Sequence, residues 1–266
     1  MSRVPEPSTD AETVLDVDGD VVSPGFIDTH SNSDLQLFAD PTLAPKVRQG
    51  IKTEILGQDG LSMAPMYREG GAEEWQDQLA GLAERVDHEW TWGDVGAYLD
   101  AVEESGIAPN VGTLVGHGTV RFNVIGMEDA EPTDEQLSEM RDLVAEAIDE
   151  GAFGLSTALV ITQCSYATTE EETAPAGELS PYGCPFVAHI RSEWGDIWNA
   201  LNEFVNIGAT AGVPVHLSHF KLGGPRAGCR LLGRPVPLHG EQHAAVARPA
   251  AVGPRREARA DGRIPS

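Results

Sequence analysis

The sequence predicts an α/β protein built on a parallel sheet, and three observations support this fold class. Six short apolar runs of strand length occur between residues 21 and 219. Stretches with helical spacing of apolar residues lie between most of them. Several of the runs also end in histidine or acidic residues. Strands that alternate with helices are typical of a parallel sheet with helical connections.

Each expected element follows from its local pattern. The strands are expected near residues 22–29, 51–57, 110–116, 152–158, 185–190 and 213–219, the first of them as a short buried strand that ends in polar residues. Helices are expected at 73–86 and 93–105, from the capping box of Thr133 and Gln136 to about residue 150, and from about 193 to 211. The last helix carries an apolar stripe made of Trp194, Ile197, Trp198, Leu201, Phe204 and Val205.

One stretch departs from the alternation. Residues 168–184 should hold a helix between two strands, but they contain Pro175, Gly177 and Pro181 and show no clear apolar stripe. Proline and glycine interrupt regular helices. We therefore expect this helix to be damaged or replaced by a loop.

Charge limits the partners of the chain. The 266 residues carry 42 acidic and 18 basic side chains, a net charge of −24. So acidic a surface repels nucleic acid and anionic membranes. It also repels itself unless salt screens it, which favours a salt-rich, halophilic source over an ordinary acidic protein. No apolar run reaches membrane-spanning length, and residues 1–20 lack a secretory pattern, so a cytoplasmic location is expected.

The chain changes character after residue 224. Residues 1–224 hold 39 acidic and 10 basic side chains, whereas residues 225–266 hold eight arginines and three acids. The last segment is rich in Arg, Ala, Pro and Gly and shows no strand or helix periodicity. We predict a short N-terminal segment at 1–20, a folded core at 21–224 and an aberrant, disordered basic tail at 225–266. A frameshift would explain the tail, and a true interaction arm is the alternative.

Candidate metal ligands stand at the ends of the predicted strands. They are His30, Asn32, Asp59, His117, His189 and His219. In a parallel barrel such side chains converge at the carboxyl ends of the strands. Neutral imidazole and carboxylate bind zinc and similar ions, which suit amide hydrolysis. Each residue also has a structural interpretation, since most buried polar groups are simply hydrogen-bonded. Asp59 beside Gly60 could be a turn residue, and we expect His216 to face the core.

Six motifs follow one another along the chain: VVSPGFIDTHSNSD (21–34), RQGIKTEILGQDGLSMAP (48–65), VGHGTVR (115–121), GAFGLSTAL (151–159), FVAHIRSE (186–193) and VHLSHFK (215–221). Together and in this order, over about residues 21–224, they resemble the N-acyl-D-amino-acid deacylase branch of the amidohydrolase superfamily. The resemblance implies an incomplete TIM-type (β/α) barrel, with about six of eight strand–helix units. It also implies hydrolysis of N-acyl-D-amino acids to a carboxylate and a free D-amino acid.

The resemblance assigns roles to particular residues. His30 would be the first-strand ligand of a divalent metal, for which zinc is expected, and Asp59 would stand where this branch has a bridging or ligating residue. His189 and His219 match the two histidines that hold the tighter-bound metal. Lys221 would lie near the small-molecule substrate, an N-acyl amino acid.

Two departures from the family pattern leave an alternative open. Asn32 replaces the second histidine of the H-x-H motif, which weakens a second metal site. No motif matches strands seven and eight, so the family's general-base aspartate on strand eight has no counterpart and the catalytic residue is unknown. The alternative is a catalytically dead fragment that at most binds metal. The sequence predicts neither the acyl group nor the oligomeric state.

The frameshift hypothesis makes a prediction about the gene. Reading it in another frame downstream of residue 224 should restore acidic, periodic sequence, including strands seven and eight and the aspartate. Sequencing the locus tests this. If neither alternative frame encodes sequence related to the family, the basic segment is a true tail.

Overall fold

The structure is a computed structural model that describes residues 17–79, 86 and 88–221. The chain divides into two units, Met1–Gly223 and Gly224–Ser266. The predicted basic tail and most of the predicted N-terminal segment lie outside the described residues.

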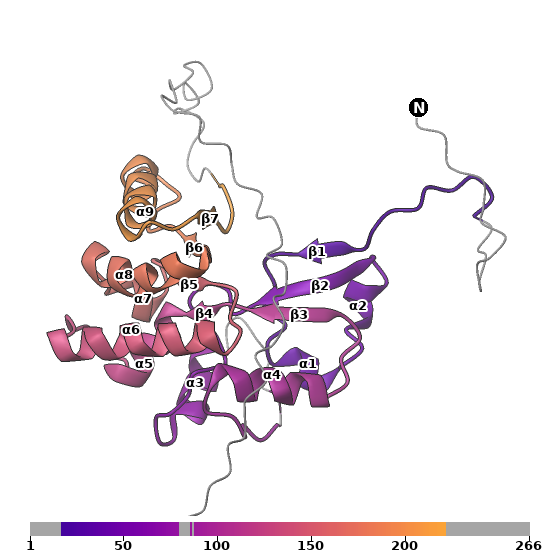
Figure 1. Cartoon of the computed structure of the whole chain (residues 1–266), viewed down its shortest axis with the longest axis horizontal. Helices are drawn as coiled ribbons and strands as arrows, with labels where there is room; N and C mark the ends of the chain where they lie inside the picture. Colours follow the sequence, from indigo (N-terminus) through magenta and orange to yellow (C-terminus); the bar gives the residue numbers. More distant parts are fainter. Residues whose placement is uncertain (1–16, 80–85, 87, 222–266) are drawn as a thin grey trace, which may run out of the picture. The chain divides into compact units, whose positions relative to one another are not determined.

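Parallel strands form the centre of the first unit (Figure 1). One sheet has the order β1 (Phe26–Asp28), β2 (Ile51–Leu56) and β3 (Asn110–Thr113). The other has the order β4 (Val115–Gly116), β5 (Leu155–Ala158), β6 (Phe186–His189) and β7 (Val215–Leu217). All five strand pairs are parallel. The predicted parallel α/β arrangement is confirmed for the described residues.

The third predicted strand changes its pairing partner in the middle. Residue Leu114 separates β3 from β4, and its amide donates to the carbonyl of Leu56, which belongs to β2. The next amide, of Val115, donates instead to the carbonyl of Gly154, just before β5. One extended segment is therefore shared between the two sheets, and Leu114 itself is buried.

Helices connect the strands, as the alternation predicts. The strands of the first sheet are connected by α1 (Gln36–Ala39) and α2 (Ala44–Val47), and then by α3 (Gly71–Leu79) and α4 (Val95–Glu104). The later connections are α5 (His117–Val124), α6 (Asp134–Asp149), α7 (Thr162–Ser165), α8 (Thr169–Ala176), the 3₁₀ helix η1 (Gly177–Tyr182) and α9 (Ile197–Ala211). In the described part of the chain no helix is both long and apolar enough to cross a bilayer.

The start and end of α6 follow the predicted capping chemistry. The Thr133 hydroxyl accepts from the Gln136 amide, and the Gln136 side chain accepts from the Thr133 amide, which completes the capping box. Gly151, just after the helix, has a φ of 115°, a backbone conformation that side chains disfavour. Both terminal signals were therefore sufficient to place this helix.

The expectation of a damaged helix at 168–184 was wrong. The segment forms α8 and η1, and the Thr168 hydroxyl caps α8 by accepting from the Glu171 amide. Pro175 lies in the last turn, where the chain continues as a 3₁₀ helix. No apolar stripe marks this helix because part of its buried face consists of Glu171 and Glu172.

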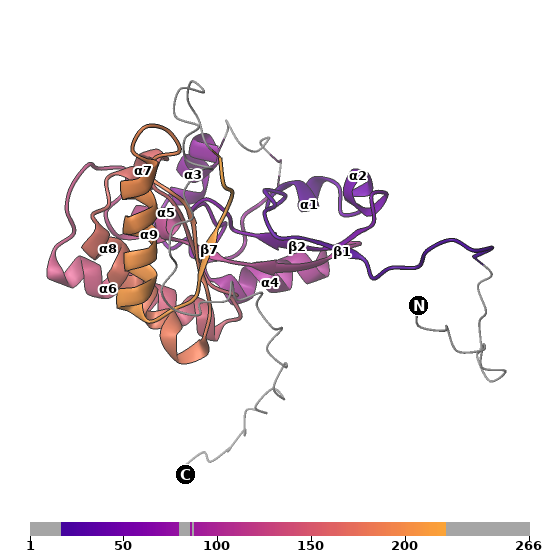
Figure 2. The ribbon, with the colours of Figure 1, turned by 90° about the horizontal axis from the view of Figure 1, so that it is seen from above.

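The last helix also differs from its prediction. It begins at Ile197 rather than near residue 193, and its buried face is Ile197, Ala200, Phe204 and Ile207. Trp194 and Trp198 of the predicted stripe are exposed. The true face follows the helical spacing from Ile197, whereas the predicted stripe mixed it with outward-facing aromatic residues. Figure 2 shows α9 running beside β7.

Both outermost strands are exposed, which corrects two expectations. The predicted buried strand at 21–30 forms β1, yet Phe26 and Ile27 are 60% and 62% exposed. His216, expected to face the core, is exposed on β7. Within the described residues β1 pairs only with β2, and β7 only with β6. The outer edges of these strands therefore have no neighbouring strand to cover their side chains.

A buried group of four charged side chains joins α8 to α5. The Nδ1 atom of His117 lies 3.0 Å from Oε1 of Glu172, and its Nε2 lies 3.4 Å from Oε1 of Glu171. The Nε atom of Arg121 donates to the same Glu171 oxygen at 2.9 Å. All four side chains are at least 98% buried. Two cations opposite two carboxylates balance the charge, which burial requires.

This balance depends on the protonation of His117. Burial by itself would lower the pKa of His117, but the charge of Glu172, together with the neighbouring Cys164 and Glu171, raises that pKa well above 6.5. Burial would raise the pKa of Glu171, but His117 and Arg121 hold it below 4.5. The stabilisation from Glu171 is thus present above pH 4.5, and that from His117 below pH 6.5, and the latter is lost as the pH rises through the raised pKa of His117.

Removal of the His117 imidazole should strongly destabilise the folded protein. We expect His117→Asn to lower the free energy of unfolding by about 3–5 kcal/mol, because two buried carboxylates then face one cation. Adding Glu172→Gln should restore part of the loss. Urea denaturation at pH 6 measures both variants. The control is Arg141→Gln, which breaks the exposed ion pair with Glu178 and should cost under about 1 kcal/mol. Equal losses for His117→Asn and the control would contradict a charge-balanced cluster.

Candidate metal centre

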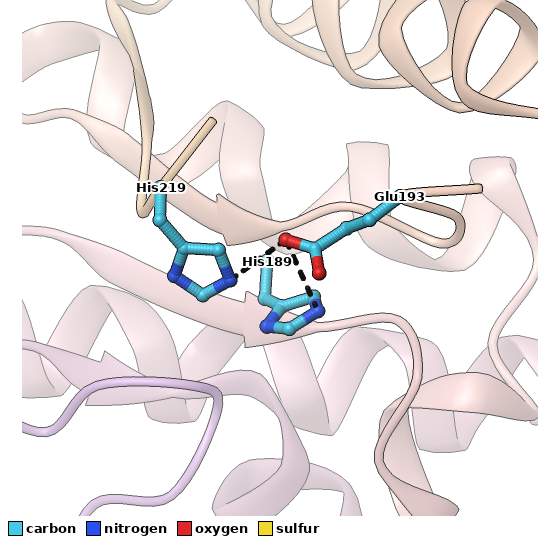
Figure 3. Close-up of side chains that lie close together, drawn as sticks. All are labelled: His189, Glu193 and His219. Carbon is cyan, nitrogen blue, oxygen red and sulfur yellow. Dashed lines mark ion pairs between the residues drawn. The ribbon is translucent and has the colours of Figure 1, made fainter. Parts of the chain in front are cut away.

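Two histidines and a carboxylate meet at the carboxyl ends of β6 and β7 (Figure 3). His189 is the last residue of β6, and His219 follows β7 by two residues. Their ring centroids lie 4.4 Å apart, with the rings perpendicular. Oε1 of Glu193 lies 2.9 Å from Nε2 of His219 and 3.8 Å from Nε2 of His189. Potential ligand atoms of these three residues all lie within 4.8 Å of one another.

A second pair adjoins this group from the other sheet. His30 lies two residues beyond β1, and Asp59 lies three residues beyond β2. Nε2 of His30 is 3.3 Å from Oδ2 of Asp59. The His30 ring lies 5.7 Å from the His219 ring, measured between centroids. The structure thus brings together the four residues that the sequence singled out, although their roles as ligands stay predictions.

The surroundings of the two outer histidines shift their pKa values in opposite directions. Burial, and then the neighbouring His219, lowers the pKa of His189. The hydrogen bond to Asp59 raises the pKa of His30, against the smaller opposing effect of burial. His189 is therefore neutral near pH 7, which is the form of imidazole that binds a metal.

The remaining candidates from the sequence lie differently. Lys221 is 56% exposed, and its Nζ atom lies 3.2 Å from Oε2 of Glu193. Asn32 is exposed. His117, which follows the β4 strand end, belongs to the buried charged cluster rather than to this group. Of the strand-end residues, four are close together and two stand outside.

Glu193 was not predicted from the sequence. It ends the motif FVAHIRSE, four residues after His189, and this spacing was the available signal. The sequence pattern instead places Glu193 at the start of the helix expected from about 193 to 211. Because α9 begins only at Ile197, Glu193 lies in the connection before the helix, where its Oε1 atom approaches both histidines.

Several polar atoms of this group lack a hydrogen-bond partner, which leaves them available to bind a metal ion. Nε2 of His219, Oε1 of Glu193 and Oδ1 of Asp59 are buried and make no well-aligned hydrogen bond. Buried polar atoms normally have partners. Imidazole nitrogens and carboxylate oxygens are ligands for zinc and similar divalent ions. The donor set therefore fits such an ion, and this is a candidate metal centre at the strand ends of an α/β protein.

Comparison with known proteins identifies the family. The model of the amidohydrolase family matches residues 13–257, and the chain belongs to this family. It is 36% identical over 214 residues to a D-aminoacylase of Alcaligenes xylosoxydans xylosoxydans, a match that covers 80% of this chain and 43% of that protein. An N-acyl-D-aspartate deacylase of the same organism is also 36% identical, over 80% of this chain and 42% of its own length.

Solved structures agree with this assignment. A crystal structure of D-aminoacylase has a TM-score of 0.70 and 31% identity, over 79% of this chain and 43% of that one. An N-acyl-D-glutamate deacylase from Bordetella bronchiseptica, complexed with zinc and a phosphonate inhibitor, has a TM-score of 0.65 and 31% identity, over 72% and 39%. The neighbours have the TIM-barrel type of amidohydrolase fold. The chain spans less than half the length of these relatives.

Loss of one central histidine should abolish tight metal binding. We expect His219→Asn to weaken Co²⁺ binding at least about 100-fold, because even residues behind the ligands typically contribute 10–100-fold. Calorimetric titration of the metal-free protein measures this. The control is His216→Asn, since His216 is exposed on β7, three residues before His219, and its loss should leave the affinity unchanged. Similar affinities in both variants would place the metal elsewhere.

Proposed function

We propose that the chain carries the metal-binding part of a hydrolase that cleaves the linear amide bond of N-acyl-D-amino acids, giving a carboxylate and a free D-amino acid. The observation that carries this proposal is the approach of His189, His219 and Glu193 within 4.8 Å of one another at the strand ends. Relatives named as D-aminoacylase, N-acyl-D-aspartate deacylase and N-acyl-D-glutamate deacylase support the substrate class.

In this proposal the metal is held between the two sheets. His189 and His219 bind it, His30 and Asp59 approach from the β1 and β2 side, and Glu193 offers a further oxygen. Zinc suits this mixture of imidazole and carboxylate. When bound, such an ion lowers the pKa of water to about 7 and polarises a carbonyl group. The low pKa of His189 keeps its imidazole available as a ligand.

Lys221 is the proposed contact for the substrate carboxylate. Its ammonium group already pairs with the carboxylate of Glu193 at 3.2 Å, so the side chain reaches a carboxylate placed at this site. More than half of the side chain is exposed, which leaves it accessible to a small molecule. An N-acyl amino acid carries its free carboxylate close to the amide bond, so one end of the substrate would be fixed beside the metal.

Metal binding without turnover is the second candidate function. The exposed strands β1 and β7 favour it, because within the described residues no further strand covers side chains such as Phe26 and Ile27. No general base is assigned on the matched motifs, and the absence of such a group typically costs about 10²–10⁴ in rate. Hydrolysis by the whole protein is therefore a proposal that must be tested against metal binding alone.

A paired binding and hydrolysis assay separates the two functions. We expect the purified 266-residue chain to bind Zn²⁺ and to release D-glutamate or D-aspartate from the N-acetyl compounds, at least about 10²-fold more slowly than D-aminoacylase on its own substrate. The N-acetyl-L compounds and the His219→Asn variant serve as controls. The rate of release should be higher in 1 M KCl than in dilute buffer, because salt screens the acidic surface. Zinc binding with no D-specific release would favour the second function, and failure to bind metal would refute both.

A further inference from the structure

The turn that carries Asp59 has a left-handed backbone. Asp59 has a φ of 58°, and Gly57 and Gly60 on either side of it have values of 67° and 76°. Residues with a Cβ rarely adopt this conformation. A Cβ on Gly57 would lie 2.1 Å from the Leu114 carbonyl oxygen, and one on Gly60 would lie 2.7 Å from Sγ of Cys164. The turn is therefore packed closely and is held in an unusual conformation by its surroundings.

One hydroxyl group closes this turn from the neighbouring sheet. Oγ of Ser156, on β5, accepts from the Gly60 amide at 3.0 Å and donates to the Gly57 carbonyl at 2.5 Å. Ser156 is completely buried. Its single oxygen thus joins the residues at the two ends of the turn, with Gln58 and Asp59 between them.

The same turn is tied to the residue before His30. The Gln58 side-chain amide donates to the Thr29 carbonyl at 2.9 Å and to the Ile55 carbonyl at 3.1 Å. Asp59 then places Oδ2 at 3.3 Å from Nε2 of His30. The direction of the Asp59 carboxylate therefore depends on hydrogen bonds that hold the turn against β1 on one side and β5 on the other.

We propose that Ser156 is a positioning residue, which holds the Gly57–Gly60 turn so that Asp59 faces His30 at the metal centre. This inference rests on the proposed function for its effect on metal affinity. The hydrogen bonds of Ser156 go to the backbone of Gly57 and Gly60, and it acts through this backbone on both sides of Asp59. Removal of its hydroxyl leaves the Gly60 amide and the Gly57 carbonyl without this partner, and the carboxylate loses its fixed direction.

Thr157 provides a matched control on the same strand. It is also completely buried, but its hydroxyl donates to Oε1 of Glu172 in the charged cluster rather than to the turn. Thr157→Val therefore removes one buried hydroxyl hydrogen bond from the adjacent residue without removing a partner of the turn. A loss of affinity that comes only from a weakened fold should be similar in Ser156→Ala and Thr157→Val.

The test is a set of Co²⁺ titrations on the full chain. We expect Ser156→Ala to weaken Co²⁺ binding about 10–100-fold, Ser156→Cys to weaken it less, and Thr157→Val to leave it unchanged. In an Asp59→Asn background, Ser156→Ala should have little further effect, since the positioned carboxylate is already gone. Equal losses of affinity in Ser156→Ala and Thr157→Val would overturn the proposal. So would a loss from Ser156→Ala that is as large in the Asp59→Asn background as in the parent chain.

A measurement without metal separates this inference from the metal centre itself. Hydrogen exchange of the Gly60 amide should become at least about tenfold faster in Ser156→Ala than in the parent chain, and should be unchanged in Thr157→Val. If the parent chain binds no Co²⁺, the proposed function fails, while the exchange rates still decide whether Ser156 holds the turn. If Ser156→Ala does not fold, Ser156→Cys carries both comparisons. Unchanged exchange at Gly60 in a folded Ser156 variant would overturn the positioning role.

Discussion

Parallel pairing is the constraint on which the arrangement of this protein depends. When neighbouring strands run in the same direction, their carboxyl ends lie on the same side of the sheet. Residues that are far apart in sequence, such as His30, His189 and His219, therefore come together without any local contact between them. The helical connections follow from the same constraint, because a chain can return to start a parallel strand only through a crossover.

The sequence predicted the parts of the structure whose signal is local. Each expected strand has a counterpart, and the capping box at Thr133 placed the start of α6. The change of partner at Leu114 was not predictable, because both halves of the segment have the same apolar pattern. Exposure of β1 and β7 also escaped prediction, since burial depends on which strands lie alongside and not on the residues of the strand.

The proximity of His30, Asp59, His189 and His219 was predicted from their places at strand ends, whereas the nearby carboxylate of Glu193 was missed. Histidines at strand ends stand out, and His189 and His219 do lie together. Acidic residues are so common in this chain that one more glutamate after a strand carries little signal, and Glu193 was assigned to a helix. Glu171 and Glu172 were missed for a related reason, since a helix that buries charge against His117 has no apolar stripe to reveal its inner face.

The change of partner at Leu114 has a mechanical consequence for the candidate metal centre. His30 and Asp59 follow strands of the first sheet, whereas His189 and His219 follow strands of the second. An ion held by residues from both groups would link the two sheets to each other. Its binding energy would then also resist their separation, by about 2.7 kcal/mol when the free ion is at 100 times its dissociation constant. Metal affinity and the cohesion of the two sheets would then be coupled.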